Sequence, residues 1–261
     1  MNNPQARRGK RPGMPAAASV VEEKAFVPGG DQPSMGVAGG APAYRILRTT
    51  EVDPYDPPVT AAAVPAIGAA PPQLVTDDFR GTARKAAKTS LSGAAIEEFD
   101  DLEDLIQTLP KHSKMVNRQP RISTDRTSNR VAEEKRNVRL AGFLYAASRE
   151  DDSDYHLIVG RDPATAPSLY MTVEISGLPR SNSAAFGKLS AARTAYKSFF
   201  GSDLPGTSYD FYDPPIPVEI EGSLFFDMSH AKGSRPGPQS LRPDMPVVWE
   251  IHPVSRIEFE P

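Results

Sequence analysis

The stretch Trp249-Glu250-Ile251-His252-Pro253-Val254 decides the interpretation of this chain. Its alternation of apolar and polar side chains is typical of a strand that has one face in a core. We interpret it as part of the last strand of a small closed β-barrel, residues 247–259, in which Pro253 is an interruption. The stretch also contains one of the four histidines of the chain, with a carboxylate two residues before it.

Four further strand-like segments precede it, at residues 138–147, 155–160, 169–176 and 218–228. One amphipathic helix, residues 183–200, lies between the third and fourth of these, with Ser183 as its expected N-cap and Gly201 just past its end. Three strands, a helix and two strands is the order of an OB-fold, a five-stranded Greek-key barrel. We therefore expect a mostly β chain with an OB-like barrel over residues 138–261.

The residues before this barrel are expected to be extensions of it. Residues 1–74 contain 12 of the 27 prolines and most of the Ala-Gly-Pro runs. Such a composition buries too little apolar surface to offset its ordering entropy, so it predicts a largely disordered or extended tether, with one short strand or docking motif at 44–48. Residues 75–137 are expected to hold short helices and a basic linker, including a helix at 101–109 capped by Asp100.

The composition also excludes classes of site and partner. The chain has no cysteine, which excludes disulfides and thiolate metal sites. No apolar run suits a signal peptide or a membrane span, so we expect a cytoplasmic protein without membrane contact. Residues 138–261 carry 16 Asp and Glu against 11 Lys and Arg. Because an acidic barrel is a poor partner for phosphate backbones, nucleic acid is not the expected ligand.

Histidines and carboxylates are expected to meet on neighbouring strands. The residues of this polar cluster, whether ligand-binding or structural, are His156, Glu174, Asp227, His230, Glu250 and His252. Imidazoles and carboxylates bind zinc or harder divalent metals, or act as general acid and base. The candidate metal ligands are His156, Glu174, Glu250 and His252. Hydrogen-bonded pairs that hold strand register use the same residue types, because buried polar groups must be paired, and the sequence leaves both interpretations open. No cofactor is predicted apart from such a metal.

Four short motifs resemble those of uncharacterised bacterial proteins with an OB-like barrel. The motifs are Asp154-Tyr155-His156-Leu157, Val173-Glu174-Ile175, Gly222-Ser223-Leu224-Phe225-Phe226-Asp227 with His230, and Trp249-Glu250-Ile251-His252-Pro253-Val254. The resemblance covers roughly the C-terminal half of the chain. It implies the fold and no particular activity.

Two classes of function follow from these observations. The first is a non-catalytic module that binds a protein or an oligomeric ligand such as a glycan, through exposed Tyr145, Tyr155 and Tyr170. The second, by analogy of fold, is a metal-dependent hydrolase or nuclease-like phosphodiesterase. Its candidate residues are Asp152, Asp154, Glu174 and Arg161. The acidic loop at 149–154 is expected to be a solvated turn. Convergence of the candidate metal ligands would favour the second class.

Overall fold

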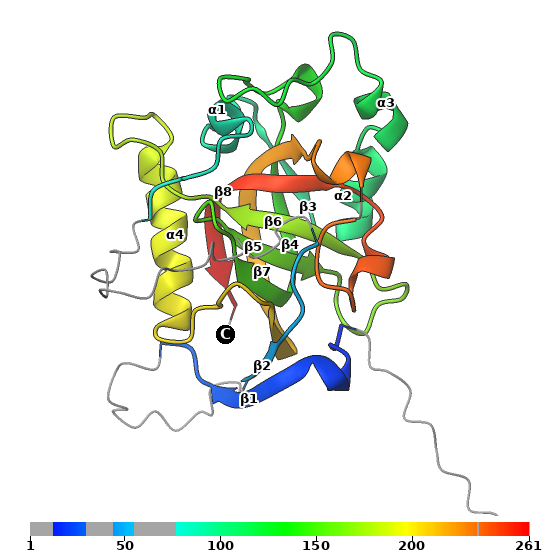
Figure 1. Cartoon of the computed structure of the whole chain (residues 1–261), viewed down its shortest axis with the longest axis vertical. Helices are drawn as coiled ribbons and strands as arrows, with labels where there is room; N and C mark the ends of the chain where they lie inside the picture. Colours follow the sequence, from blue (N-terminus) through cyan, green and yellow to red (C-terminus); the bar gives the residue numbers. More distant parts are fainter. Residues whose placement is uncertain (1–12, 30–43, 55–76, 234, 261) are drawn as a thin grey trace, which may run out of the picture.

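Five strands pair in a closed ring in the computed structural model, which describes residues 13–29, 44–54, 77–233 and 235–260 (Figure 1). They are β4 (Asn137–Arg149), β5 (Tyr155–Gly160), β6 (Tyr170–Ile175), β7 (Asp210–Phe226) and β8 (Trp249–Phe259). The strands pair in the order β4-β5-β6-β8-β7, and β7 pairs again with β4. Every pairing in the ring is antiparallel except that of β6 with β8. The chain is mostly β, as the sequence predicts.

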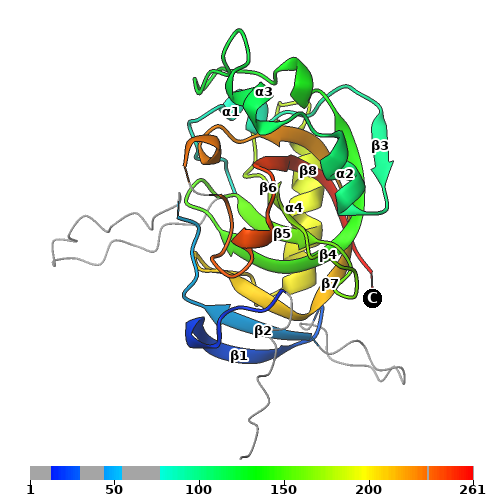
Figure 2. The ribbon, with the colours of Figure 1, turned by 90° about the vertical axis from the view of Figure 1, so that its right-hand side faces the viewer.

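Three more strands extend the ring to a mixed sheet of eight strands. They are β1 (Val20–Phe26), β2 (Tyr44–Thr49) and β3 (Ile96–Phe99). The β1–β2 pair joins the first part of β7, and β3 pairs in parallel with β4 at the other edge (Figure 2). Here the structure differs from the extended tether expected at 1–74, because Phe26, Tyr44 and Ile46 reach the hydrophobic core. The rest of that expectation concerns residues 1–12, 30–43 and 55–74, which lie outside the described residues.

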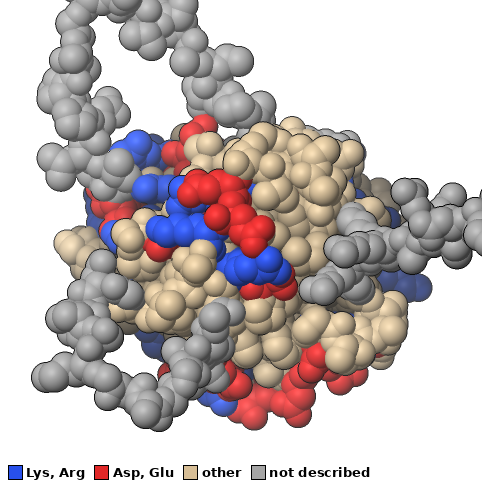
Figure 3. Space-filling model, turned by 90° about the horizontal axis from the view of Figure 1, so that it is seen from below, with Lys and Arg blue, Asp and Glu red and all other residues tan. Residues whose placement is uncertain are grey.

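Acidic and basic side chains lie next to one another on the face that Figure 3 shows. Among β1, β2 and β7, Arg45 pairs with both Glu23 and Asp213. Exposed ion pairs contribute only about 0–1 kcal/mol each. We therefore attribute the attachment of β1 mainly to Phe26, whose ring stacks on that of Phe200 with centroids 5.3 Å apart.

The strand β7 begins at Asp210, so the predicted start at residue 218 is wrong. Its first residues pair with β2 on one side and, at Asp210 and Phe211, with β4 on the other; the pairing with β4 resumes at Ile216. Pro214 and Pro215 lie in this interruption of the β4 ladder, where no ladder N–H is required of them. Proline therefore marks a bulge within the strand and does not end it. Pro253 likewise lies inside β8, where the register with β7 shifts.

The helix α4 (Phe186–Phe200) connects β6 and β7, as predicted, and packs on β8 along one side of the molecule (Figure 1). Its N-cap is Ala185, so the prediction of Ser183 is wrong by two residues. Tyr196 and Phe200 on its buried face belong to the core. Phe199 stacks on Phe259 at 3.8 Å between ring centroids, which ties the helix to the end of β8.

Three short α-helices precede the ring in the described part of the chain. They are α1 (Lys85–Lys88), α2 (Leu102–Thr108) and α3 (His112–Val116). The predicted helix at 101–109 is α2, but its cap is Asp101, whose carboxylate accepts the Glu103 N–H at 2.7 Å, and not Asp100. No helix in the described parts of the chain has the length and apolar character needed to cross a membrane.

Gly222 gives a direct test of the β7–β8 packing. A Cβ there would lie 2.5 Å from Ile251 Cγ2 and 2.6 Å from the Pro253 carbonyl oxygen. We expect Gly222→Ala to lower the free energy of unfolding by about 1–3 kcal/mol through overpacking. Gly187→Ala is the matched control, because nothing lies within 4 Å of its Cβ position and alanine favours a helix. Urea titration should show a loss for the first variant and none for the second; equal stabilities would contradict the packing described.

Candidate metal centre

The side chains of β5, β6 and β8 alternate between the core and a polar outer face. Leu157 and Val173 belong to the core, so their neighbours His156 and Glu174 lie on the opposite face. The same alternation places Glu250 of β8 beside them. Every residue of β5 and β6 is nevertheless buried, because other segments cover this face. The outer face is therefore buried, and His156, Glu174 and Glu250 form a polar layer on part of it, next to a second hydrophobic cluster.

His252 lies at the centre of this layer. Its Nδ1 is 2.6 Å from Glu174 Oε2 and 3.5 Å from Glu250 Oε2. Its Nε2 is 3.4 Å from Asp154 Oδ2. None of these four residues is more than 3% exposed. We call Asp154, Glu174, Glu250 and His252 the buried quartet.

The quartet contains several buried polar atoms that lack a hydrogen-bond partner among the described residues. They are both ring nitrogens of His252, Oδ2 of Asp154 and Oε2 of Glu174 and of Glu250. The short contacts within the quartet therefore lack hydrogen-bond geometry, and each orphaned buried atom costs about 1–3 kcal/mol. A bound cation removes this cost. One ligand atom each from Asp154, Glu174 and His252 lie within 4.8 Å of one another, a spacing that a single divalent cation can span.

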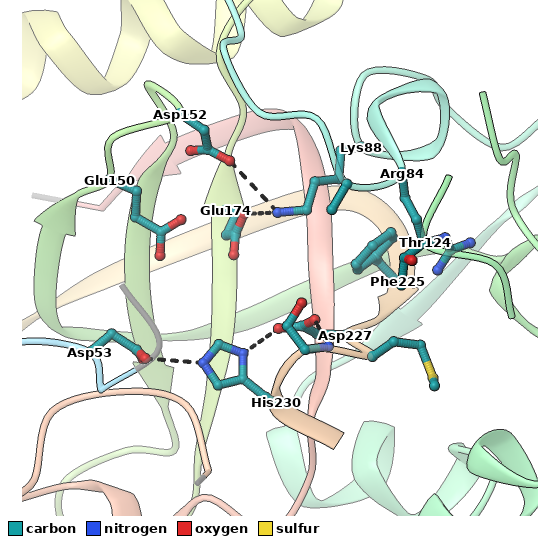
Figure 4. Close-up of a pocket in the computed structure, with 13 residues that line it drawn as sticks. Asp53, Arg84, Lys88, Thr124, Glu150, Asp152, Glu174, Phe225, Asp227 and His230 are labelled. Atoms are coloured by element: carbon teal, nitrogen blue, oxygen red, sulfur yellow. Dashed lines mark hydrogen bonds and ion pairs between the residues drawn. The ribbon is translucent and has the colours of Figure 1, made fainter. Parts of the chain in front are cut away.

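A cavity of about 220 Å³ adjoins the quartet at Glu174 (Figure 4). The charged residues that line it are Asp53, Arg84, Lys88, Glu150, Asp152, Glu174, Asp227 and His230. Arg84 is already paired with Glu134 through two hydrogen bonds of 2.6 Å. Five lining carboxylates therefore face the two remaining basic side chains, Lys88 and His230. This excess of negative charge attracts cations into the cavity.

The other two histidines of the cluster have partners on both ring nitrogens. His156 Nδ1 is 2.6 Å from Glu150 Oε1, and its Nε2 is 3.2 Å from Thr172 Oγ1. His230 lies between Asp227 and Asp53, with Nε2 3.0 Å from the Asp53 carboxylate. The structure thus brings all six residues of the predicted cluster together. Only His252 among these three histidines keeps its ring nitrogens free of hydrogen bonds to the described residues.

Burial and charge set the protonation of the quartet. Burial, with Asp152 and Glu174 adding to it, raises the pKa of Asp154 well above its usual value, and burial does the same to the pKa of Glu250. Burial lowers the pKa of His252 despite the nearby Glu174. Burial opposes ionisation of Glu174, but His252 and Lys88 together hold its pKa well below the usual range.

Several residues of this site were not predicted. Lys88 comes from the segment expected to hold short helices and a basic linker, and Asp53 from the expected tether; no local pattern marks either residue. The turn expected at 149–154 is present, but it is only partly solvated: Asp151 is exposed, whereas Asp154 is fully buried and accepts the Gly177 N–H at 2.6 Å. Arg161 does not line the cavity and pairs with Asp101 and Glu103. Asp152 lines the cavity, whereas Asp154 belongs to the quartet beside it.

The stacking surface expected for the barrel is also absent. Tyr145, Tyr155 and Tyr170 are each at most 2% exposed, so the prediction of exposed aromatic side chains is wrong. Tyr155 packs against Tyr196 of α4, and Tyr145 packs edge-to-face on Tyr170. These three rings fill the core, so none of them offers a stacking surface to an oligomeric ligand.

His230 provides a pH-dependent test of the cavity wall. Burial opposes its charge, but hydrogen bonds with Asp227 and Asp53 raise the pKa of His230 to about 10 from 6.5. The folded state then binds more protons than the unfolded state between these values, so stability falls as pH rises from 6.5 to about 10. Each unit of pKa difference contributes about 1.4 kcal/mol. Urea titrations in EDTA should show this fall, and His230→Gln should reduce it; identical profiles would contradict the assignment.

A scan against protein-family models, a search of curated proteins and a search of solved structures each returned no match. The resemblance to uncharacterised bacterial proteins therefore stays a prediction, and the function has to be argued from the geometry.

Proposed function

We propose that this chain is a divalent-metal-dependent hydrolase built on an OB-like barrel, with the metal held by the buried quartet. The order of pairings, closed by β7 on β4 and with β6 parallel to β8, supports the OB-like interpretation. In this interpretation β1, β2 and β3 are additions at the edges of the barrel. The quartet then lies on the outer face across the second, third and fifth barrel strands.

The observation that carries the proposal is the set of unpaired atoms in the quartet. Three carboxylate oxygens and an imidazole are buried, close together and without hydrogen-bond partners in the described structure. Carboxylates suit Mg²⁺, Mn²⁺ and Ca²⁺, and imidazole suits Zn²⁺ and other transition metals. The mixed set favours Mn²⁺ or Zn²⁺. Bound there, such an ion would supply a coordinated water of lowered pKa.

The cavity favours a hydrolase over a non-catalytic binding module. Structural metal sites are closed, whereas catalytic sites keep one side open to substrate, and Glu174 belongs to both the quartet and the cavity wall. Lys88 and His230 are cations on that wall, where they would stabilise negative charge that develops during hydrolysis. The binding-module class depended on exposed aromatic rings, and those rings are buried.

Hydrolysis assays on the full chain test the proposal. The substrates are a nitrophenyl phosphodiester, a nitrophenyl phosphomonoester and the nitrophenyl ester of a carboxylic acid. Each is assayed with Mn²⁺, Zn²⁺, Mg²⁺ or EDTA. We expect release of nitrophenol from at least one ester that depends on the metal and stops in EDTA. Metal binding without hydrolysis of any ester would favour the binding module. Absence of both would overturn the proposal.

A further inference from the structure

We infer that the cavity beside the quartet binds the phosphoryl group of a substrate, and that Lys88 is the side chain that holds its oxygens. The inference rests on the proposed metal site and names the class of ester that the enzyme would accept. It is carried by the position of Lys88, by the charge of the cavity and by its size.

Lys88 is partly buried, with a side chain that is 17% exposed, and its ammonium group has no hydrogen bond to the described residues. Its Nζ lies 3.8 Å from Asp152 Oδ2 and 3.9 Å from Glu174 Oε2, which are ion-pair distances beyond hydrogen-bond reach. Figure 4 shows the side chain extending from α1 toward the space between these carboxylates. The ammonium therefore keeps its N–H donors available on the cavity side.

The charge of the cavity determines when an anion can enter. Without a metal, the five lining carboxylates repel a phosphate. A divalent cation on Glu174 offsets part of this negative charge and also takes over one of the two carboxylates that face Lys88. An anion that carries a charge of about −1.5 to −2 and three acceptor oxygens then fits between the cation and the ammonium. Phosphate binding is thus expected to require the metal.

The size of the cavity limits what enters it. At about 220 Å³ it is smaller than the pockets of about 300–1,000 Å³ that enclose drug-sized ligands. It has room for one compact polar group and not for a sugar or nucleobase as well. We therefore expect the phosphoryl group to enter the cavity while the rest of the ester stays outside.

Mn²⁺ and inorganic phosphate are the probes for this inference. Full-length protein in excess over Mn²⁺ is titrated with phosphate, and binding is followed by the paramagnetic enhancement of ³¹P relaxation; free Mn²⁺ is measured by electron paramagnetic resonance. We expect Lys88→Met to bind phosphate at least about tenfold more weakly, since a hydrogen bond to a charged group is lost. Its Mn²⁺ affinity should be equal or higher. Lys85→Met is the matched control on the same helix, because Lys85 donates to the Phe79 carbonyl and does not line the cavity.

Each outcome decides a separate claim. Equal phosphate affinity in Lys88→Met and the native chain would overturn the inference, as would phosphate binding without Mn²⁺ or acetate binding as tight as phosphate. Mn²⁺ binding without any phosphate effect would overturn this inference and leave the metal site standing. Failure of the native chain to bind Mn²⁺ would instead overturn the proposed function. If Lys88→Met does not fold, Lys88→Arg, which keeps the charge, and the phosphate–acetate comparison on the native chain give the answer.

Discussion

Glu174→Gln is expected to abolish metal binding and, with it, metal-dependent hydrolysis. Glu174 contacts His252 at 2.6 Å, faces Lys88 and lines the cavity. Removing an outer partner of a metal ligand already weakens metal affinity about 10–100-fold, so loss of a direct ligand should cost at least about 100-fold. Calorimetric titration with Mn²⁺ measures the affinity, and the nitrophenyl ester that the native chain hydrolyses measures activity.

Glu221→Gln is the matched control for this prediction. Glu221 lies in the same sheet but pairs with Arg139 and Arg256 on a partly exposed face, away from the cavity. Its substitution should leave Mn²⁺ affinity within about twofold of the native value, because exposed ion pairs contribute little. Native-like Mn²⁺ affinity in Glu174→Gln would exclude Glu174 as a ligand.

Arg84→Met is expected to lower the free energy of unfolding by about 3–5 kcal/mol, the usual cost of breaking a buried ion pair. Arg84 and Glu134 are at most 2% exposed and share two hydrogen bonds of 2.6 Å. Without the guanidinium, the Glu134 carboxylate is left as a buried charge. Arg84 directly precedes α1, so the variant should also misplace Lys88 and weaken phosphate binding. Urea titration gives the stability change.

Two further variants separate this mechanism from a general loss of packing. In Arg84→Met with Glu134→Gln the buried charge is gone, so the double variant should be more stable than Arg84→Met alone. Arg118→Met removes a partner of Glu133, which is next to Glu134 in the chain, but that pair is about one-fifth exposed and should contribute no more than about 1 kcal/mol. Equal losses in Arg84→Met and Arg118→Met would contradict the importance given to the buried pair.

The sequence predicts the strands of the ring because their side chains alternate with period two, and this pattern survives in the structure. It fails where proline and a bulge occur together, as at Pro214 and Pro215 in β7. It also fails for β1 and β2, since Phe26 and Tyr44 gain their burial from α4 and β7, which are more than 140 residues away in the chain. Composition indicates how much apolar surface a segment has, but not whether a distant surface covers it.

The candidate site, too, could be predicted from the sequence only in part. Glu174, Glu250 and His252 could be predicted to lie together, because neighbouring strands place them on one face. Lys88 and Asp53 could not, since they reach the cavity through the path of the chain over that face. Asp154 was placed in a solvated loop because acidic runs are usually exposed. Here the loop turns inward, and the Gly177 N–H satisfies one oxygen of Asp154.

Anomalous X-ray scattering at the manganese edge, from crystals grown with Mn²⁺, tests the central claim most directly. We predict one strong anomalous peak within bonding distance of Glu174 and His252, with Asp154 or Glu250 completing its ligands. A crystal that contains manganese but shows no peak among these four residues would contradict the metal site and the function proposed from it.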